Sequence, residues 1–387
     1  MKKLFLFLLF IPAFLTAVPA FLAAESMYSP TYGFYMDIPE GYEYIDGDGR
    51  NNFSFAGPAR SMFDIIVYDG RYSSINELVN DISGKIGNKG DADFYRYRGR
   101  QAALIQLNFD ASFDGVTLER QDGWGLCVEL DGGDRRPMLL ALAYGPAGKS
   151  ELEVFHISAL DSIAPSLAER RYPGPITEYT YPRGRTTTAN LAASGVSTRI
   201  YENDAEAAQI LIEREYYILQ NYINTPYLQQ AWTRYYRCIY RDSYDRVTAA
   251  AAALVRNWGG TPADSDEAKR AFAQKALAFV QGFQYDRDLS GSDFLNLVSA
   301  VTEGRGDCDS RAVLWAIILS HVDIRCAFMI SHHYGHAMGL ADIAGTGARF
   351  EAGGTRWLVA ETTASVDIGL INQETSDPQY WFAVIFE

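Results

Sequence analysis

The chain has 387 residues, of which 48% are hydrophobic, and its formal net charge is −14. This length is comfortable for two domains, and the apolar content is sufficient for a full core. The chain has 48 acidic side chains and only 34 basic ones. This balance argues against nucleic-acid binding, because phosphate contacts need Lys and Arg in excess. It also argues against electrostatic adhesion to anionic lipid.

The N-terminus has the order of a secretory signal peptide. Lys2 and Lys3 precede an apolar stretch that ends in small residues at Ala23 and Ala24. The alternative is an uncleaved membrane anchor, because the apolar stretch is just long enough to span a bilayer. The small residues at its end favour cleavage. We therefore predict a signal peptide over residues 1–24, an exported protein (periplasmic or secreted), and no membrane-spanning segment after cleavage.

Residues 25–168 are predicted to form an α+β domain with a mostly antiparallel sheet. Ser74 caps a predicted amphipathic helix over residues 75–86, with Glu77 in the capping-box position. Predicted strands cover residues 62–68, 101–109, 123–130 and 138–144. We expect a closing helix over residues 158–167 and place His156 in a strand-like run without a partner.

The segment Gly-Phe-Tyr-Met-Asp-Ile-Pro-Glu-Gly at 33–41 resembles the start of PsbP/Mog1-like envelope domains. The resemblance covers this motif and the order of the predicted elements. No cluster of titratable groups is evident in this domain, so we expect it to have a structural or binding role.

Residues 169–200 are rich in Pro, Gly, Thr and Arg and are predicted to be a linker. Residues 201–387 are predicted to be a helical lead-in followed by a catalytic domain, with its core at about 271–387. Apolar residues at helical spacing predict helices over residues 205–222, 227–245, 247–258 and 265–283.

The segment around Cys308 is the most informative for chemistry. Gly304 and Gly306 precede it, and the helix that follows is apolar nearly all round, which indicates burial. The positive end of such a helix lowers the pKa of a thiol, and its first N–H groups can bind an oxyanion. Asp307 and Asp309 oppose thiolate formation, so a base must assist.

A candidate base and a candidate acid follow on predicted strands. His336 begins the strand over residues 336–343, where neutral imidazole can accept the thiol proton. Glu361 ends the next strand, where a carboxylate can orient the imidazole. We expect His332 and His333 to be ordinary surface histidines.

A zinc site is the competing use of these residues. His332, His333 and His336 could supply ligands together with Cys308 or Cys326. Adjacent residues of a strand or turn point to opposite faces, so convergence is awkward, and we predict neither a metal nor a cofactor. The four cysteines fit no zinc-finger spacing; we predict no disulfide and expect Cys127, Cys238 and Cys326 to behave as small buried hydrophobes.

The order Gly-x-Cys before an apolar helix, His-Ala at a strand start, and Trp with an acid four residues later followed by Thr resembles the transglutaminase-like superfamily. The resemblance covers about residues 271–363. It implies a papain-like core with Cys308 as nucleophile, His336 as base and Glu361 as acid. Two departures are Glu361, where the family usually has Asp, and Met338, where many members have Trp.

We therefore predict an exported transglutaminase-like cysteine enzyme that acts on peptide or carboxamide bonds through a thioester. Water as acceptor would make it a protease or amidase, and an amine would make it an acyltransferase. The expected partner is a peptide or protein substrate of the cell envelope. Tyr285 is a candidate second oxyanion donor. The alternative is a catalytically inactive fold that serves as an envelope binding or scaffold module, which the Glu361 departure favours.

Overall fold

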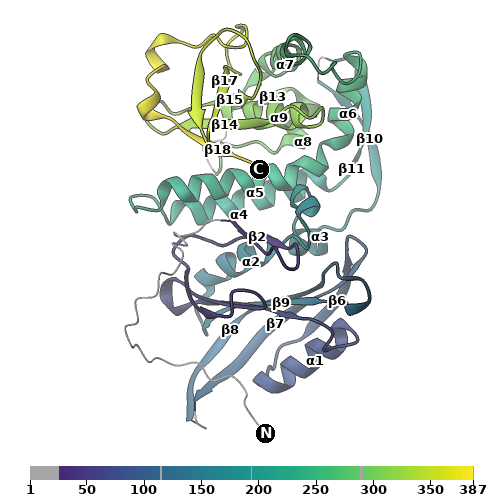
Figure 1. Cartoon of the computed structure of the whole chain (residues 1–387), viewed down its shortest axis with the longest axis vertical. Coiled ribbons are helices and arrows are strands. Elements are labelled where there is room, and N and C mark those ends of the chain that lie inside the picture. The colour runs from purple at the N-terminus through teal and green to yellow at the C-terminus, as the bar shows by residue number, and fades with distance from the viewer. Residues whose placement is uncertain (1–25, 114–115, 193, 288–290, 387) are drawn as a thin grey trace. The chain divides into compact units, whose positions relative to one another are not determined.

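The computed structural model describes residues 26–386 apart from 114–115, 193 and 288–290 (Figure 1). The predicted signal peptide, residues 1–24, lies outside the described residues. Within the described part of the chain, no helix has the length and apolar character needed to cross a membrane. The chain divides into two compact units: Met1–Arg170 with Gly174–Thr180, and Arg171–Pro173 with Tyr181–Glu387.

The first unit is built on a seven-stranded antiparallel sheet with the order β3-β4-β5-β9-β8-β7-β6. Its strands are β3 (Glu43–Gly47), β4 (Asn52–Ala56), β5 (Met62–Tyr68), β6 (Ala92–Tyr97), β7 (Arg100–Phe113), β8 (Val116–Glu129) and β9 (Met138–Pro146). Because successive side chains of a strand point to opposite faces, the sheet presents two apolar surfaces. Each surface is covered by other elements.

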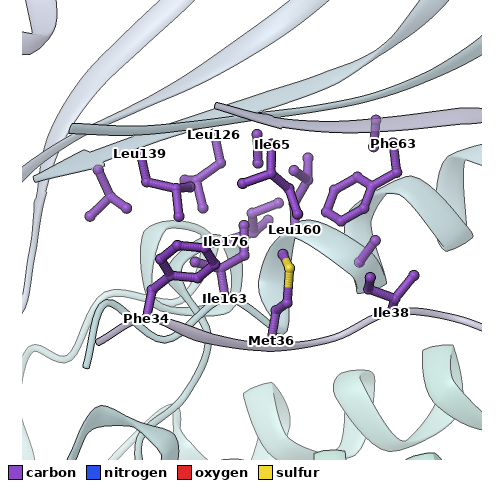
Figure 2. Packing of buried hydrophobic residues seen from close by; sticks show 14 of the residues in the cluster. Phe34, Met36, Ile38, Phe63, Ile65, Leu126, Leu139, Leu160, Ile163 and Ile176 are labelled. Carbon is purple, nitrogen blue, oxygen red and sulfur yellow. The ribbon is translucent and has the colours of Figure 1, made fainter. Parts of the chain in front are cut away.

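Helix α1 (Ile75–Ile86) covers one face of this sheet, and its bounds match the prediction because Ser74 accepts a hydrogen bond from the N–H of Glu77. The short hairpin of β1 (Ser26–Tyr28) and β2 (Tyr35–Asp37) covers the other face together with α2 (Glu153–Asp161) and α3 (Pro175–Thr180). Figure 2 shows side chains from this hairpin and these helices packed beneath the sheet.

The closing helix of this unit differs from the prediction. Helix α2 ends at Asp161, and Ala164 instead forms an antiparallel bridge with Tyr35. Pro165 explains why the helix ends here, because the helical conformation is disfavoured for the residue before a proline, which is Ala164. His156 lies on α2 and not on a strand, since a short apolar run cannot by itself distinguish a buried strand from a buried helix.

The predicted linker over residues 169–200 is also structured. It contains α3 and a hairpin of β10 (Thr186–Leu191) and β11 (Val196–Tyr201). Asp161 caps α3 by accepting hydrogen bonds from the N–H groups of Ile176 and Thr177, at 2.9 and 2.8 Å. The carboxylate that starts this helix lies about fifteen residues upstream, so local composition does not reveal it.

The hairpin of β10 and β11 begins the second unit, and helices follow it. They lie at the predicted places except for the helix over residues 297–303, which we did not predict. They are α4 (Asp204–Gln220), α5 (Leu228–Arg246), α6 (Thr248–Asn257), α7 (Asp266–Gln281), α8 (Leu297–Glu303) and α9 (Cys308–Ser320). A buried ion cluster ties α4 to α5: the Arg246 guanidinium lies 2.7 Å from carboxylate oxygens of both Asp242 and Asp204. All three side chains are buried, so their charges depend on one another for compensation.

A five-stranded antiparallel sheet packs against α9 in this unit, with the order β16-β17-β15-β14-β18. Its strands are β14 (Cys326–Ser331), β15 (His336–Ala341), β16 (Arg349–Ala352), β17 (Thr355–Ala360) and β18 (Phe382–Ile385). Gly339 of β15 lets the helix approach closely, because a Cβ there would lie 2.5 Å from the ring of Trp315. Both units are α+β, as predicted.

Candidate active site

Cys308 is the first residue of the buried helix α9. The Asp307 side chain caps the helix by accepting from the N–H of Ser310 at 2.8 Å. The N–H groups of Cys308 and Asp309, at the first two helical positions, precede the intrahelical ladder and point toward the helix start. The thiol residue is only 7% exposed. This geometry places the sulfur beside backbone donors that can bind an oxyanion.

A buried arginine, which we did not predict as a site residue, holds the chain segment that precedes Cys308. Arg311, one turn along α9, donates from Nε to the carbonyl of Gly306 at 3.1 Å and from Nη2 to the carbonyl of Phe283 at 2.7 Å. Nη1 of the same side chain lies 3.5 Å from the carbonyl of Thr362. One side chain therefore links the residues before the cysteine, the segment just after α7 and the segment that carries Glu361. Burial lowers the pKa of its guanidinium.

His336 and Glu361 form a hydrogen-bonded pair. The imidazole Nε2 lies 2.8 Å from Oε2 of Glu361, and Oε1 accepts from the N–H and hydroxyl of Thr363 at 2.7 and 2.6 Å. Gln281 supports the same segment by donating to the carbonyl of Glu361 at 2.8 Å. Burial raises the pKa of Glu361, but the hydrogen bonds from His336 and Thr363 outweigh it and lower the pKa overall.

The start of β15 lies next to the thiol. The backbone of Ala337, the residue after His336, makes a hydrogen bond that favours the Cys308 thiolate. His336 also lies close enough to Asp309, the residue after the cysteine, to affect the pKa of that carboxylate. Nε2 of His336 faces Glu361, whereas Sγ of Cys308 faces Asp309. The structure thus brings the three predicted site residues into one neighbourhood.

The carboxylates beside Cys308 oppose its ionisation. The thiol Sγ donates to Oδ1 of Asp309 at 3.1 Å. Burial raises the pKa of Cys308 well above its ordinary value, and the charges of Asp309 and Asp307 raise it further. The phenol of Tyr236 donates to Oδ2 of Asp309 and holds that carboxylate in place. These groups favour the neutral thiol form of Cys308, so an attack by its sulfur would need a base.

The histidines and cysteines considered as zinc ligands do not converge on one point. His333 stacks on Tyr380 with ring centroids 4.1 Å apart, while His336 is bound to Glu361. Among the residues that the structure describes, the one convergent group of three potential ligands is Asp307, Cys308 and Asp309, whose donor atoms lie within 4.8 Å of one another. Oxygens of both carboxylates already accept hydrogen bonds from Ser310, Tyr236 or Cys308.

Tyr285 and the other cysteines complete the set of predicted residues. Tyr285 is 51% exposed, and the guanidinium of Arg311 lies 5.5 Å from its ring centroid. Burial and the nearby Cys308 raise the pKa of its phenol. Its role as an oxyanion donor stays a prediction. All four cysteines are free thiols; Cys127 and Cys326 are buried, and Cys238 is half-buried.

Comparison with known proteins gives no family for this chain. No protein-family model and no curated protein matches it. Solved structures that are similar include cyanobacterial PsbP from Synechocystis, with 12% identity over 38% of this chain and 96% of that chain (TM-score 0.28). A second is a Bacteroides thetaiotaomicron protein, with 12% identity over 62% of this chain and 81% of that chain (TM-score 0.25). A third is calcium-bound LapG of Legionella pneumophila, with 17% identity over 45% of this chain and 87% of that chain (TM-score 0.23).

Proposed function

We propose that the second unit is a cysteine acyl-transfer enzyme that acts on a peptide or carboxamide carbonyl. The observation that carries the proposal is the His336–Glu361 hydrogen bond at 2.8 Å, formed beside a thiol at the start of a buried helix. Two hydrogen bonds from Thr363 fix the carboxylate of Glu361. A histidine with only a structural role would not need a partner that is held in place in this way. Glu361 replaces the shorter Asp of the resembled superfamily, and its side chain makes the orienting hydrogen bond.

The proposed reaction follows from these positions. Nδ1 of His336 removes the Cys308 proton as the sulfur attacks the carbonyl carbon, and Glu361 stabilises the resulting imidazolium. The N–H groups at the start of α9 bind the oxyanion. Collapse of the tetrahedral intermediate breaks the C–N bond, the imidazolium gives its proton to the leaving amine, and a thioester remains on Cys308. Water or a second amine then releases the acyl group.

The substrate class is proposed from the chemistry of this site and from the predicted export of the chain. A thioester route suits amide carbonyls, and an exported protein meets the peptides and proteins of the cell envelope. The first unit has a separate core, so it can bind a partner independently of the chemistry.

The test is acylation of Cys308. The full chain without residues 1–24 is incubated with an activated peptidyl ester, and the adduct is located and timed by peptide mass spectrometry. His336→Ala should slow acylation of Cys308 by about 100-fold or more, since a positioned base contributes about that factor. The matched control is His332→Ala, which removes an exposed histidine from the same turn and should acylate at the wild-type rate.

Two results would contradict the proposal. One is acylation of Cys308 at equal rates with and without His336. The other is no acylation of the wild-type protein while the fold remains intact, which would favour the scaffold alternative.

A further inference from the structure

The first unit contains a pocket that the proposed chemistry does not use. Its volume is about 310 Å³, at the lower end of the range of small-molecule sites. Strands β7 and β8 form its floor, where Gln106 pairs with Trp124 and Asn108 pairs with Asp122 across the two strands. These four side chains share one face of the sheet, because residues two apart on a strand point the same way. The start of α2 and the residues before it form the wall.

His156 of α2 carries the clearest sign of a ligand site. It lines the pocket, its residue is only 3% exposed, and its Nε2 is buried without a hydrogen-bond partner. Buried polar atoms are nearly always paired, because an unpaired one costs about 1–3 kcal/mol. Burial lowers the pKa of His156 to about 4, so at neutral pH the ring is uncharged and offers one donor and one acceptor.

The other polar groups of the pocket are already oriented by the protein. The Asn108 amide donates to Oδ1 of Asp122 at 2.9 Å, and the Trp124 indole donates to Oε1 of Glu153 at 3.1 Å. Each of these carboxylates keeps a second oxygen that can accept from a ligand. The pocket therefore combines fixed acceptors, amide groups and an aromatic ring.

The charge and the residue types of the pocket lining indicate which class of ligand it can bind. The lining has two carboxylates, Asp122 and Glu153, against one lysine, Lys149, so a phosphate or another polyanion is disfavoured. The many polar groups disfavour a lipid. Among the described residues, no group of convergent metal-ligand atoms includes Asp122 or Glu153, so a metal ion does not account for the site. A ligand rich in hydroxyl groups, with apolar ring faces, matches donors, acceptors and an indole together.

We propose that this pocket binds a short saccharide, whose hydroxyl groups bond to Nε2 of His156, the Gln106 and Asn108 amides and the free carboxylate oxygens, while a sugar ring packs on Trp124. This site is independent of Cys308. It assigns the first unit a recognition function for glycans.

The test uses the full chain without residues 1–24 and four probes: glucose, N-acetylglucosamine, cellobiose and N,N′-diacetylchitobiose. Ligand-observed NMR detects binding, and titration gives the dissociation constant. At least one probe should bind, and Trp124→Ala and His156→Phe should each weaken binding at least tenfold. The matched control is Phe94→Ala, which removes an exposed aromatic ring from β6 outside the pocket and should bind like the wild type.

Gln106→Ala is the third pocket variant, because this exposed floor residue can change without disturbing the core. It should also weaken binding while thermal unfolding stays unchanged. The proposal is overturned if no probe binds, if a probe binds equally well to all three pocket variants, or if inorganic phosphate displaces the sugar. Acylation of Cys308 should remain at the wild-type rate in every pocket variant, so the two proposals can fail separately.

Discussion

Replacing Asp309 with Asn tests the electrostatic account of the Cys308 thiol. The carboxylate accepts from Sγ, and its charge raises the thiol pKa, whereas an amide of the same shape is neutral. An ionised carboxylate at 3.1 Å interacts with a thiolate by about 5 kcal/mol at an effective dielectric constant of about 20. That energy equals about four pKa units and is an upper limit, because desolvation also raises the pKa of Asp309 and reduces its ionised fraction.

We therefore expect Asp309→Asn to lower the pKa of Cys308 by about one to three units. At a fixed pH below that pKa, each unit raises the thiolate fraction tenfold but lowers the nucleophilicity of the thiolate. The net rate of alkylation by iodoacetamide should rise between about threefold and fortyfold. The rate is measured across pH by mass spectrometry of the Cys308 peptide, which separates it from Cys127, Cys238 and Cys326.

Asp342→Asn is the matched control. It removes one exposed carboxylate from the same unit, where Asp342 pairs with Arg325 at 2.9 Å, so the change in net charge is identical. Its alkylation profile should match the wild type. A folded Asp309→Asn protein that is alkylated no faster than the wild type would refute the view that this carboxylate holds the thiol neutral.

Three further predictions concern other parts of the chain. Glu361→Gln should slow acylation of Cys308 by about 100-fold or more without loss of fold, because the imidazolium loses its charge partner; an unchanged rate would exclude Glu361 from the mechanism. Arg246→Leu should destabilise the second unit by about 3–5 kcal/mol in urea unfolding, since Asp242 loses its buried partner and Asp204 keeps only Arg183 at 3.4 Å. A loss under about 1 kcal/mol would contradict the buried cluster. Burial lowers the pKa of His156 from 6.5 to about 4, so protons bind more tightly to this group in the unfolded chain than in the folded protein. The stability that depends on the neutral ring is therefore complete above about pH 6.5 and is lost as the pH falls to about 4. We expect about 3 kcal/mol less stability at about pH 4 from this group, and a His156→Phe protein with the same pH dependence as the wild type would contradict it.

Local sequence signals determined much of the secondary structure. Helix α1 has the predicted bounds because its cap, Ser74, and its apolar period are both local. Strand β5 also has the predicted bounds, and Cys308 begins α9 as its flanking glycines and apolar run indicated. The order of Cys308 at a helix start, His336 at a strand start and Glu361 directly after a strand likewise follows from local patterns.

Only the tertiary structure decided the features that depend on contacts between distant residues. Tyr236 holds Asp309 across 73 positions of the chain, and Asp161 caps a helix in what was predicted to be a linker. Arg311 gave no signal beyond a charged residue in an apolar helix, although its guanidinium joins three segments. The pocket at His156 forms only where residues of β7 and β8 meet the start of α2. A periodicity or a cap acts between neighbours in sequence, whereas a buried polar partner is fixed by the whole fold.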